Sequence, residues 1–214
     1  SNGWIIVDRF EGKGRHSIKR HFNFHPDSKL EQIGPQSILA WDPICNNGLR
    51  FDFAIPNDSP QNHFDFTQTG LWSGRYGDIQ RAPHLVVETV DTPEITLLTF
   101  VTPIFSGRES QSGEDEPTLE GQKVGDHSTY VYQRRIGHSG HMIEEFSLIN
   151  PSGRSITMPS GHICNARFAY LARSSEGLVQ RAFLIGEDAL MISSDFQLIC
   201  QKYEKSASFQ SVIQ

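Results

Sequence analysis

Apolar and polar residues alternate with a period of two through most of this chain of 214 residues. In the segment 50–55, Phe51 and Phe53 alternate with polar or small residues, which is the pattern of a half-buried β-strand. Between 162 and 172 the even positions again carry mostly small, apolar or aromatic side chains. This alternation predicts a fold built from β-strands.

Helical patterns are missing, since no segment has the apolar spacing of a three-turn helix and the best candidate, 27–32, would form barely one turn. Connections long enough for parallel crossovers are also missing, which favours antiparallel pairing. We therefore predict an all-β fold, a large antiparallel two-sheet β-sandwich of the supersandwich kind with very little helix; a closed barrel is the alternative. The predicted strands are 4–10, 16–25, 36–42, 49–55, 62–67, 84–90, 94–101, 129–136, 143–149, 154–158, 162–172, 178–185, 189–193 and 196–203.

Composition excludes several classes of protein. Hydrophobic residues make up 37% of the chain and charged residues 21%, which suits a folded domain with a core. The net charge of −6 argues against nonspecific nucleic-acid binding, which needs a basic surface. The apolar runs are far shorter than a membrane-spanning helix, so no transmembrane helix and no membrane partner is expected.

An acidic stretch suggests how the chain is organised. Residues 109–122 contain five acidic residues and several turn formers, and we interpret them as an acidic loop or linker. Residues 1–108 would form one β-sandwich portion, and 123–214 would either continue its strands or form a second small β unit. Ser1 and Asn2 resemble the remnant of a cleaved tag, so we expect the chain to be part of a longer protein.

The sequence contains no recognisable motif for nucleophilic catalysis. It has no Gly-x-Ser-x-Gly elbow, no phosphate-binding Gly-Lys-Ser/Thr and no Gly-x-Gly-x-x-Gly. The three cysteines are too few and too scattered for a disulfide framework and leave the redox compartment open. Cys164 is in phase with an apolar face, which predicts a core residue.

Nine histidines raise the question of a metal site. His21 and His25 are two strand repeats apart, about 13 Å, which is too far for one zinc ion, so we interpret their side of the strand as a polar surface. His138 and His141 are flanked by glycines and predict a hairpin tip. No third ligand follows at a recognisable spacing, and we assign no metal ligand and no cofactor to this chain.

The segment 71–77, Leu-Trp-Ser-Gly-Arg-Tyr-Gly, combines two aromatic residues, a cation and two glycines. Such residues can stack on sugar rings and pair with carboxylates. We predict a loop here. The alternative is a corner in which Trp72 and Tyr76 pack beneath neighbouring strands.

Several segments in a fixed order resemble one protein family. They are Gly-Trp-Ile-Ile-Val-Asp-Arg at 3–9, Gly-x-His at 14–16, His-Phe-Asn-Phe-His-Pro at 21–26, Trp-Ser-Gly-Arg-Tyr-Gly at 72–77, and the apolar strands 85–90 and 95–101 followed by Pro103. Together they are similar to the C-terminal β-sandwich of heparinase II/III-like polysaccharide lyases. The resemblance covers residues 3–105, whereas 125–214 show only compatible strands.

The resemblance implies a particular role for the chain. In this family an N-terminal α/α toroid packs on β-sandwich layers, and the full-length protein cleaves uronic-acid polysaccharides by β-elimination, with glycosaminoglycans or alginate as substrates. The family's acid/base residues and metal motif match no residues here, so the chain is expected to be non-catalytic and to support the substrate cleft. The resemblance further implies a periplasmic or secreted full-length protein that can carry a divalent metal such as zinc.

An independent carbohydrate-binding β-sandwich remains the alternative function. Under both hypotheses the partner is an anionic polysaccharide, and under the first also the toroid. Residues 1–30 have a net charge of +3 while the rest of the chain sums to −9, so we expect an anionic ligand near the first strands. The alternative is that Arg20 and Arg75 pair with Asp8 and Asp78. The candidate binding residues are Arg15, Arg20, His21, Trp72, Arg75 and Tyr76.

Overall fold

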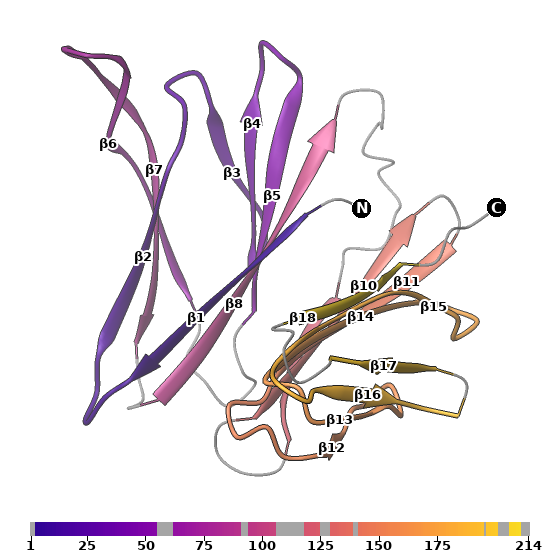
Figure 1. Ribbon diagram of the computed structural model, residues 1–214. Helices are drawn as coiled ribbons and strands as arrows, with labels where there is room; N and C mark the ends of the chain where they lie inside the picture. The colour runs from indigo at the N-terminus through magenta and orange to yellow at the C-terminus, as the bar shows by residue number, and fades with distance from the viewer. Residues whose placement is uncertain are drawn as a thin grey trace. The chain divides into compact units, whose positions relative to one another are not determined.

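The computed structural model describes residues 3–54, 62–90, 94–105, 118–124, 129–138, 141–194, 196–200 and 206–210. Within these residues the regular secondary structure consists of β-strands, β1 to β18, and their pairings are antiparallel (Figure 1). The predicted all-β, antiparallel fold is therefore confirmed. The strands form four sheets, and the chain divides into two compact units, Ser1–Gln111 (unit 1) and Ser112–Gln214 (unit 2).

Unit 1 contains a five-stranded and a three-stranded sheet, with strand orders β1-β8-β5-β4-β3 and β2-β7-β6. The strands of the larger sheet are β1 (Trp4–Glu11), β8 (Glu94–Phe105), β5 (Asn47–Ala54), β4 (Ser37–Asp42) and β3 (Lys29–Gly34). The strands of the smaller sheet are β2 (Ser17–Asn23), β7 (Asp78–Val90) and β6 (His63–Arg75).

The core of unit 1 lies between its two sheets. Phe51 and Phe53 of β5 and Leu85 of β7 belong to one buried cluster, against which Phe22 and Phe64 pack. The ring of Phe22 meets that of Phe51 edge-on at 5.5 Å, so side chains of both sheets interdigitate. The alternation in the sequence thus directs one face of each sheet into a shared core.

Arg20 lies on this inner face, in phase with the core side of β2, and is only 6% exposed. Its guanidinium donates hydrogen bonds to Thr99 Oγ1 at 3.0 Å and to Asn62 Oδ1 at 3.2 Å, and it covers the ring of Phe53. A buried cation needs such partners because its desolvation is costly. Arg20 therefore links the two sheets.

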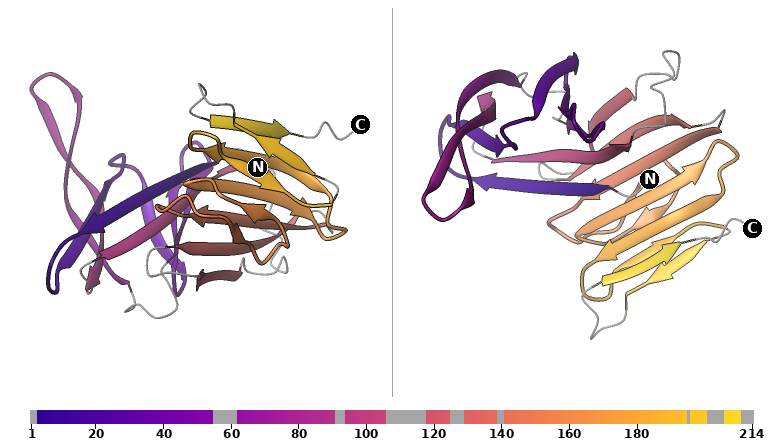
Figure 2. Two further views of the ribbon diagram at one scale, coloured as in Figure 1. Left: turned by 60° about the horizontal axis from the view of Figure 1, so that its bottom comes forward. Right: turned by 90° about the horizontal axis from the view of Figure 1, so that it is seen from above.

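Unit 2 contains a six-stranded and a four-stranded sheet, with strand orders β18-β15-β14-β11-β10-β9 and β12-β13-β16-β17 (Figure 2). The strands of the larger sheet are β18 (Ser206–Gln210), β15 (Val179–Ile185), β14 (Phe168–Ser174), β11 (His141–Ile149), β10 (Tyr130–His138) and β9 (Thr118–Lys123). The strands of the smaller sheet are β12 (Ile156–Thr157), β13 (Ile163–Cys164), β16 (Leu190–Ile192) and β17 (Gln197–Ile199).

The core of unit 2 again joins two sheets. Phe146, Leu171 and Leu184 of the larger sheet cluster with Cys164 and Met191 of the smaller one. Cys164 is fully buried, which confirms the prediction of a core residue, and burial raises the pKa of its thiol to about 11. The thiol is therefore protonated at neutral pH.

Some strand boundaries differ from the prediction. The predicted strand 162–172 is two strands, because residues 165–167 bond to other segments: Asn165 N–H donates to Leu190 O and Arg167 N–H to Ile185 O. The strands β3, β9 and β18 were not predicted. Most of the predicted acidic loop lies outside the described residues, but its last part, 118–122, belongs to β9, so that boundary was wrong. Within the described residues no helix is able to span a membrane.

Candidate functional site

The outward side of the three-stranded sheet of unit 1 is rich in histidine. In β2 the core residues Ile18 and Phe22 alternate with outward residues, and His21 is exposed. The predicted polar surface on this side of the strand is confirmed. We call the side chains of His21, His25, His63, Trp72 and His84 the histidine face.

His21 and His84 are in direct contact on this face. In the pairing of β2 with β7, Asn23 lies opposite His84 and His21 lies opposite Val86, so the two histidines are diagonal neighbours. His21 Nδ1 and His84 Nε2 are 3.1 Å apart, and the rings are within 18° of parallel. One nitrogen donates a proton to the other, and the pair remains accessible to solvent.

Gly70 provides space for this pair. A Cβ atom at position 70 would lie 2.8 Å from the carbonyl oxygen of Ala82 and 3.1 Å from both Asn23 Oδ1 and His84 Cβ. Any larger residue would push the β6 backbone away from β7. Glycine at this position therefore lets the side chains of Asn23 and His84 lie close over the neighbouring strand.

His25 and Trp72 form a second contact. Their ring centroids are 4.8 Å apart with 75° between the planes, an edge-to-face arrangement. His25 Nδ1 also lies 3.4 Å from Asp27 Oδ2. Trp72 folds over Gly74, where a Cβ atom would lie 2.1 Å from the indole ring. The glycine thus fixes where the indole can lie.

The β6–β7 hairpin ends beside this pair. β6 continues to Arg75, which is opposite Asp78, and Tyr76 and Gly77 form the turn, with a φ of 82° at Gly77. Most of the segment 71–77 is therefore strand, and the prediction of a loop was wrong except at the turn. Tyr76 is fully exposed, so the alternative that it packs beneath neighbouring strands is also wrong.

The structure separates the predicted site residues. His21 and Trp72 lie on the histidine face, and Arg75 and Tyr76 lie at the hairpin end next to it. Arg15 is exposed in the connection between β1 and β2. Arg20 is a correction: as an inner-face residue it is buried among its own partners and does not belong to the surface.

The sequence analysis missed His84. Nothing in the local pattern of β7 distinguishes it, because its importance comes from the register of β7 with β2. The sequence suggests a pairing of His21 with His25 along one strand. The contact that forms is across strands, which only the sheet topology could provide.

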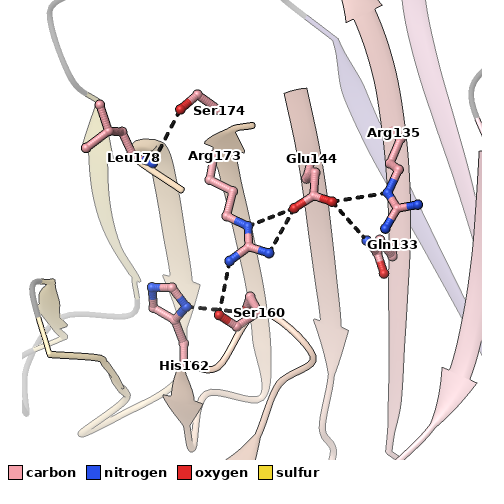
Figure 3. Close-up of polar contacts among 8 residues, drawn as sticks. All are labelled: Gln133, Arg135, Glu144, Ser160, His162, Arg173, Ser174 and Leu178. Carbon is pink, nitrogen blue, oxygen red and sulfur yellow. Dashed lines mark hydrogen bonds and ion pairs between the residues drawn. The ribbon is translucent and has the colours of Figure 1, made fainter. Parts of the chain in front are cut away.

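Unit 2 contains a different polar cluster (Figure 3). Glu144 accepts hydrogen bonds from Arg173 Nε at 2.9 Å and from Arg135 Nε at 3.1 Å, and Arg173 also donates to the carbonyl oxygen of Ser160. His162 is buried and contacts Ser160 Oγ at 3.2 Å. This cluster ties the loop between β12 and β13 to the larger sheet.

The other histidine pair marks a hairpin. His138 and His141 are register partners at the end of β10 and β11, which confirms the predicted hairpin tip. Among the side chains that the structure describes, no group of three or more His, Cys, Asp or Glu is placed to hold a metal ion.

Comparison with known proteins adds no relative. No protein-family model matches the chain, and no curated protein matches it.

Proposed function

We propose that this chain is the C-terminal β-sandwich part of a heparinase II/III-like polysaccharide lyase, and that the histidine face with the adjacent hairpin end binds an anionic polysaccharide. In the full-length protein an N-terminal α/α toroid and the metal motif would carry out β-elimination. The chain itself would support the substrate cleft without catalysing the reaction.

The observation that carries the proposal is the clustering of aromatic and cationic side chains at one end of the β2-β7-β6 sheet. Trp72 touches His25, and the exposed Arg75 and Tyr76 follow on the same strand and its turn. Flat rings offer stacking surfaces for sugars, while arginine and protonated histidine pair with carboxylate or sulfate groups. A polymer of acidic sugars needs both kinds of contact.

A second candidate function is an independent carbohydrate-binding module. It is favoured by one observation: unit 1 has its own two-sheet core, so a ligand surface on it does not depend on further domains for its fold. The gene sequence upstream of Trp4 separates the two functions. A helical toroid encoded there supports the lyase, and its absence supports the module.

Binding is tested by titrating the chain with heparin, heparan sulfate and alginate oligosaccharides in a calorimeter. Each exposed cation contributes only about 0.2–1 kcal/mol, so binding should be weak and should disappear at about 0.5 M salt. The variants Trp72→Ala and Arg75→Ala should each weaken it. Arg167→Ala, which removes an exposed cation of unit 2, is the matched control and should bind like the unchanged chain.

If the Trp72→Ala and Arg75→Ala variants bind as tightly as the unchanged chain, the proposed surface is refuted. The non-catalytic role has its own test, the rise in ultraviolet absorbance that accompanies the unsaturated product of β-elimination. We expect none with the isolated chain. A rise that depends on one of its histidines would overturn that part of the proposal.

A further inference from the structure

We infer that His21 and His84 form a binding site for one divalent transition-metal ion, with His21 Nδ1 and His84 Nε2 as the protein ligands. The site lies on the same histidine face as the proposed polysaccharide surface, but its two ligands are other residues than Trp72 and Arg75, and the binding of the ion does not depend on the proposed function.

The distance between the two nitrogens carries the inference. Two imidazole nitrogens bound to one zinc ion at about 2.0–2.1 Å lie about 3.3 Å apart at the tetrahedral angle. At the right angle preferred by copper and nickel they lie about 2.9 Å apart. The observed separation of 3.1 Å falls between these values. Turning the two rings away from their mutual hydrogen bond directs both lone pairs at one ion without moving the nitrogens further apart.

The backbone holds the pair in this position. Both histidines are on paired strands, β2 and β7, and the register places them as diagonal neighbours. Gly70 on β6 leaves the space that the Asn23 and His84 side chains occupy. A pair of ligands on rigid strands loses little conformational entropy when it closes on an ion.

The surroundings permit an ion to enter and to stay. His21 is exposed and His84 half-buried, so solvent reaches both rings. Across the sheet Asp65 lies opposite Val86, and Glu88 lies opposite both His63 and Lys19. Two carboxylates against one lysine give this part of the face a slight negative charge, which favours a cation.

The ligand set defines the class of metal. Two neutral imidazoles suit zinc, copper and nickel and do not suit magnesium or calcium, which prefer oxygen ligands. Because the protein supplies two ligands, the remaining positions are open to water or to an anionic oxygen of another molecule. When the metal ion takes the place of the hydrogen between the rings, the donor ring carries its proton on its other nitrogen, so both imidazoles stay neutral and no net proton is released.

The experiment is a titration of the metal-free chain with zinc, followed by long-range ¹H–¹⁵N spectra of the imidazoles. Zinc should fix His21 with its proton on Nε2 and His84 with its proton on Nδ1. His21→Gln and His84→Gln should each lower the affinity at least about tenfold, since even outer partners of metal ligands change affinity by 10–100-fold. His63→Gln, on the same face, is the control and should bind zinc unchanged.

Copper gives an independent readout. Its electron paramagnetic resonance spectrum should show coupling to two imidazole nitrogens, and this coupling should be lower in His21→Gln and in His84→Gln. The inference is overturned if zinc leaves the tautomers of His21 and His84 unchanged. It is also overturned if affinity is lost in His138→Gln and retained in His21→Gln, because the ion then binds at the other hairpin.

Discussion

Histidines in the two units have opposite surroundings. His162 of unit 2 is buried, bonded to Ser160 and packed edge-on against Phe196 at 5.9 Å. His21 and His84 of unit 1 touch each other on an accessible face. The first belongs to the interior of its unit, whereas the second pair can exchange its mutual contact for a ligand. Surroundings, and not residue type, decide which histidines are candidates for binding.

The charged groups show the same difference. In unit 2, Arg134 Nε donates to Glu145 Oε2 at 2.7 Å, and Tyr170 donates to the other oxygen of that carboxylate. Burial, together with the Glu145 carboxylate, raises the pKa of Tyr170. Arg134 and Glu145 neutralise each other, and the hydrogen bonds of this cluster stabilise the interior of unit 2. At the hairpin end of unit 1, Arg75 and Tyr76 are exposed to solvent.

The largest expected effect is a loss of stability when the buried ion pair of unit 2 is removed. Glu145→Gln removes the charge that balances Arg134, and both side chains are only 6% exposed. Leaving one buried charge without its partner costs about 3–5 kcal/mol of unfolding free energy. Urea unfolding followed by circular dichroism measures the loss.

Tryptophan fluorescence follows the unfolding of unit 1 separately, since Trp4, Trp41 and Trp72 all lie in unit 1 and Glu145 lies in unit 2. The exposed Glu176→Gln is the charge-matched control and should have little effect. A stability of Glu145→Gln equal to that of this control would show that the buried pair is not needed.

A pH dependence follows from Cys164. Its thiol ionises near 9 in the unfolded chain and near 11 in the folded one, so the unfolded state loses its proton first as pH rises. Stability is therefore full below pH 9 and falls between pH 9 and 11 by about 2–3 kcal/mol. Urea titrations across this range measure the slope. In Cys164→Ala the slope should become shallower, and an unchanged slope would assign it to other groups.

A substitution of Arg20 tests whether unit 1 also contains a buried polar group that stabilises its fold. Arg20→Met keeps an unbranched apolar side chain but removes the guanidinium and its hydrogen bonds to Thr99 and Asn62. We expect a loss of about 2 kcal/mol, because hydrogen bonds to charged groups are worth about 1.5–3 kcal/mol. Tryptophan fluorescence during urea unfolding measures it. Binding of oligosaccharide by the folded variant should persist, and its loss would return Arg20 to the ligand surface.

The smallest expected effect on stability belongs to the histidine face. His21→Gln and His84→Gln replace accessible side chains, so unfolding free energy should change by no more than about 0.5 kcal/mol. Gly70→Ala is the contrasting variant, because its Cβ would meet the backbone of Ala82. It should destabilise unit 1 clearly. If the two glutamine variants are as destabilised as Gly70→Ala, the pair is part of the fold.

The class of fold was predictable because alternation is a local property of each strand. The polar side of β2 and the burial of Cys164 followed from the same period of two. The extension of β6 to Arg75 was not predictable, since the glycines at 70 and 74 resemble a loop until their close neighbours are known.

The candidate site was predictable only in part. His21, Trp72, Arg75 and Tyr76 have the right chemistry and lie on or beside the face. Arg20 was wrongly assigned to the surface, because its charge was considered without its place in the alternation of β2. That alternation directs the Arg20 side chain inward. His84 required the register between β2 and β7, which the sequence does not encode locally.

We propose that ligands bind to the outward face of the β2-β7-β6 sheet and not to the polar cluster of unit 2. A ¹H–¹⁵N NMR titration with an anionic oligosaccharide at low salt tests it most directly. We expect the signals of His25, Trp72, Arg75 and Tyr76 to shift, and these shifts to vanish at about 0.5 M salt, while the signals of Glu144 and Arg173 do not move. Shifts centred on Glu144 and Arg173, or none in unit 1, would contradict it.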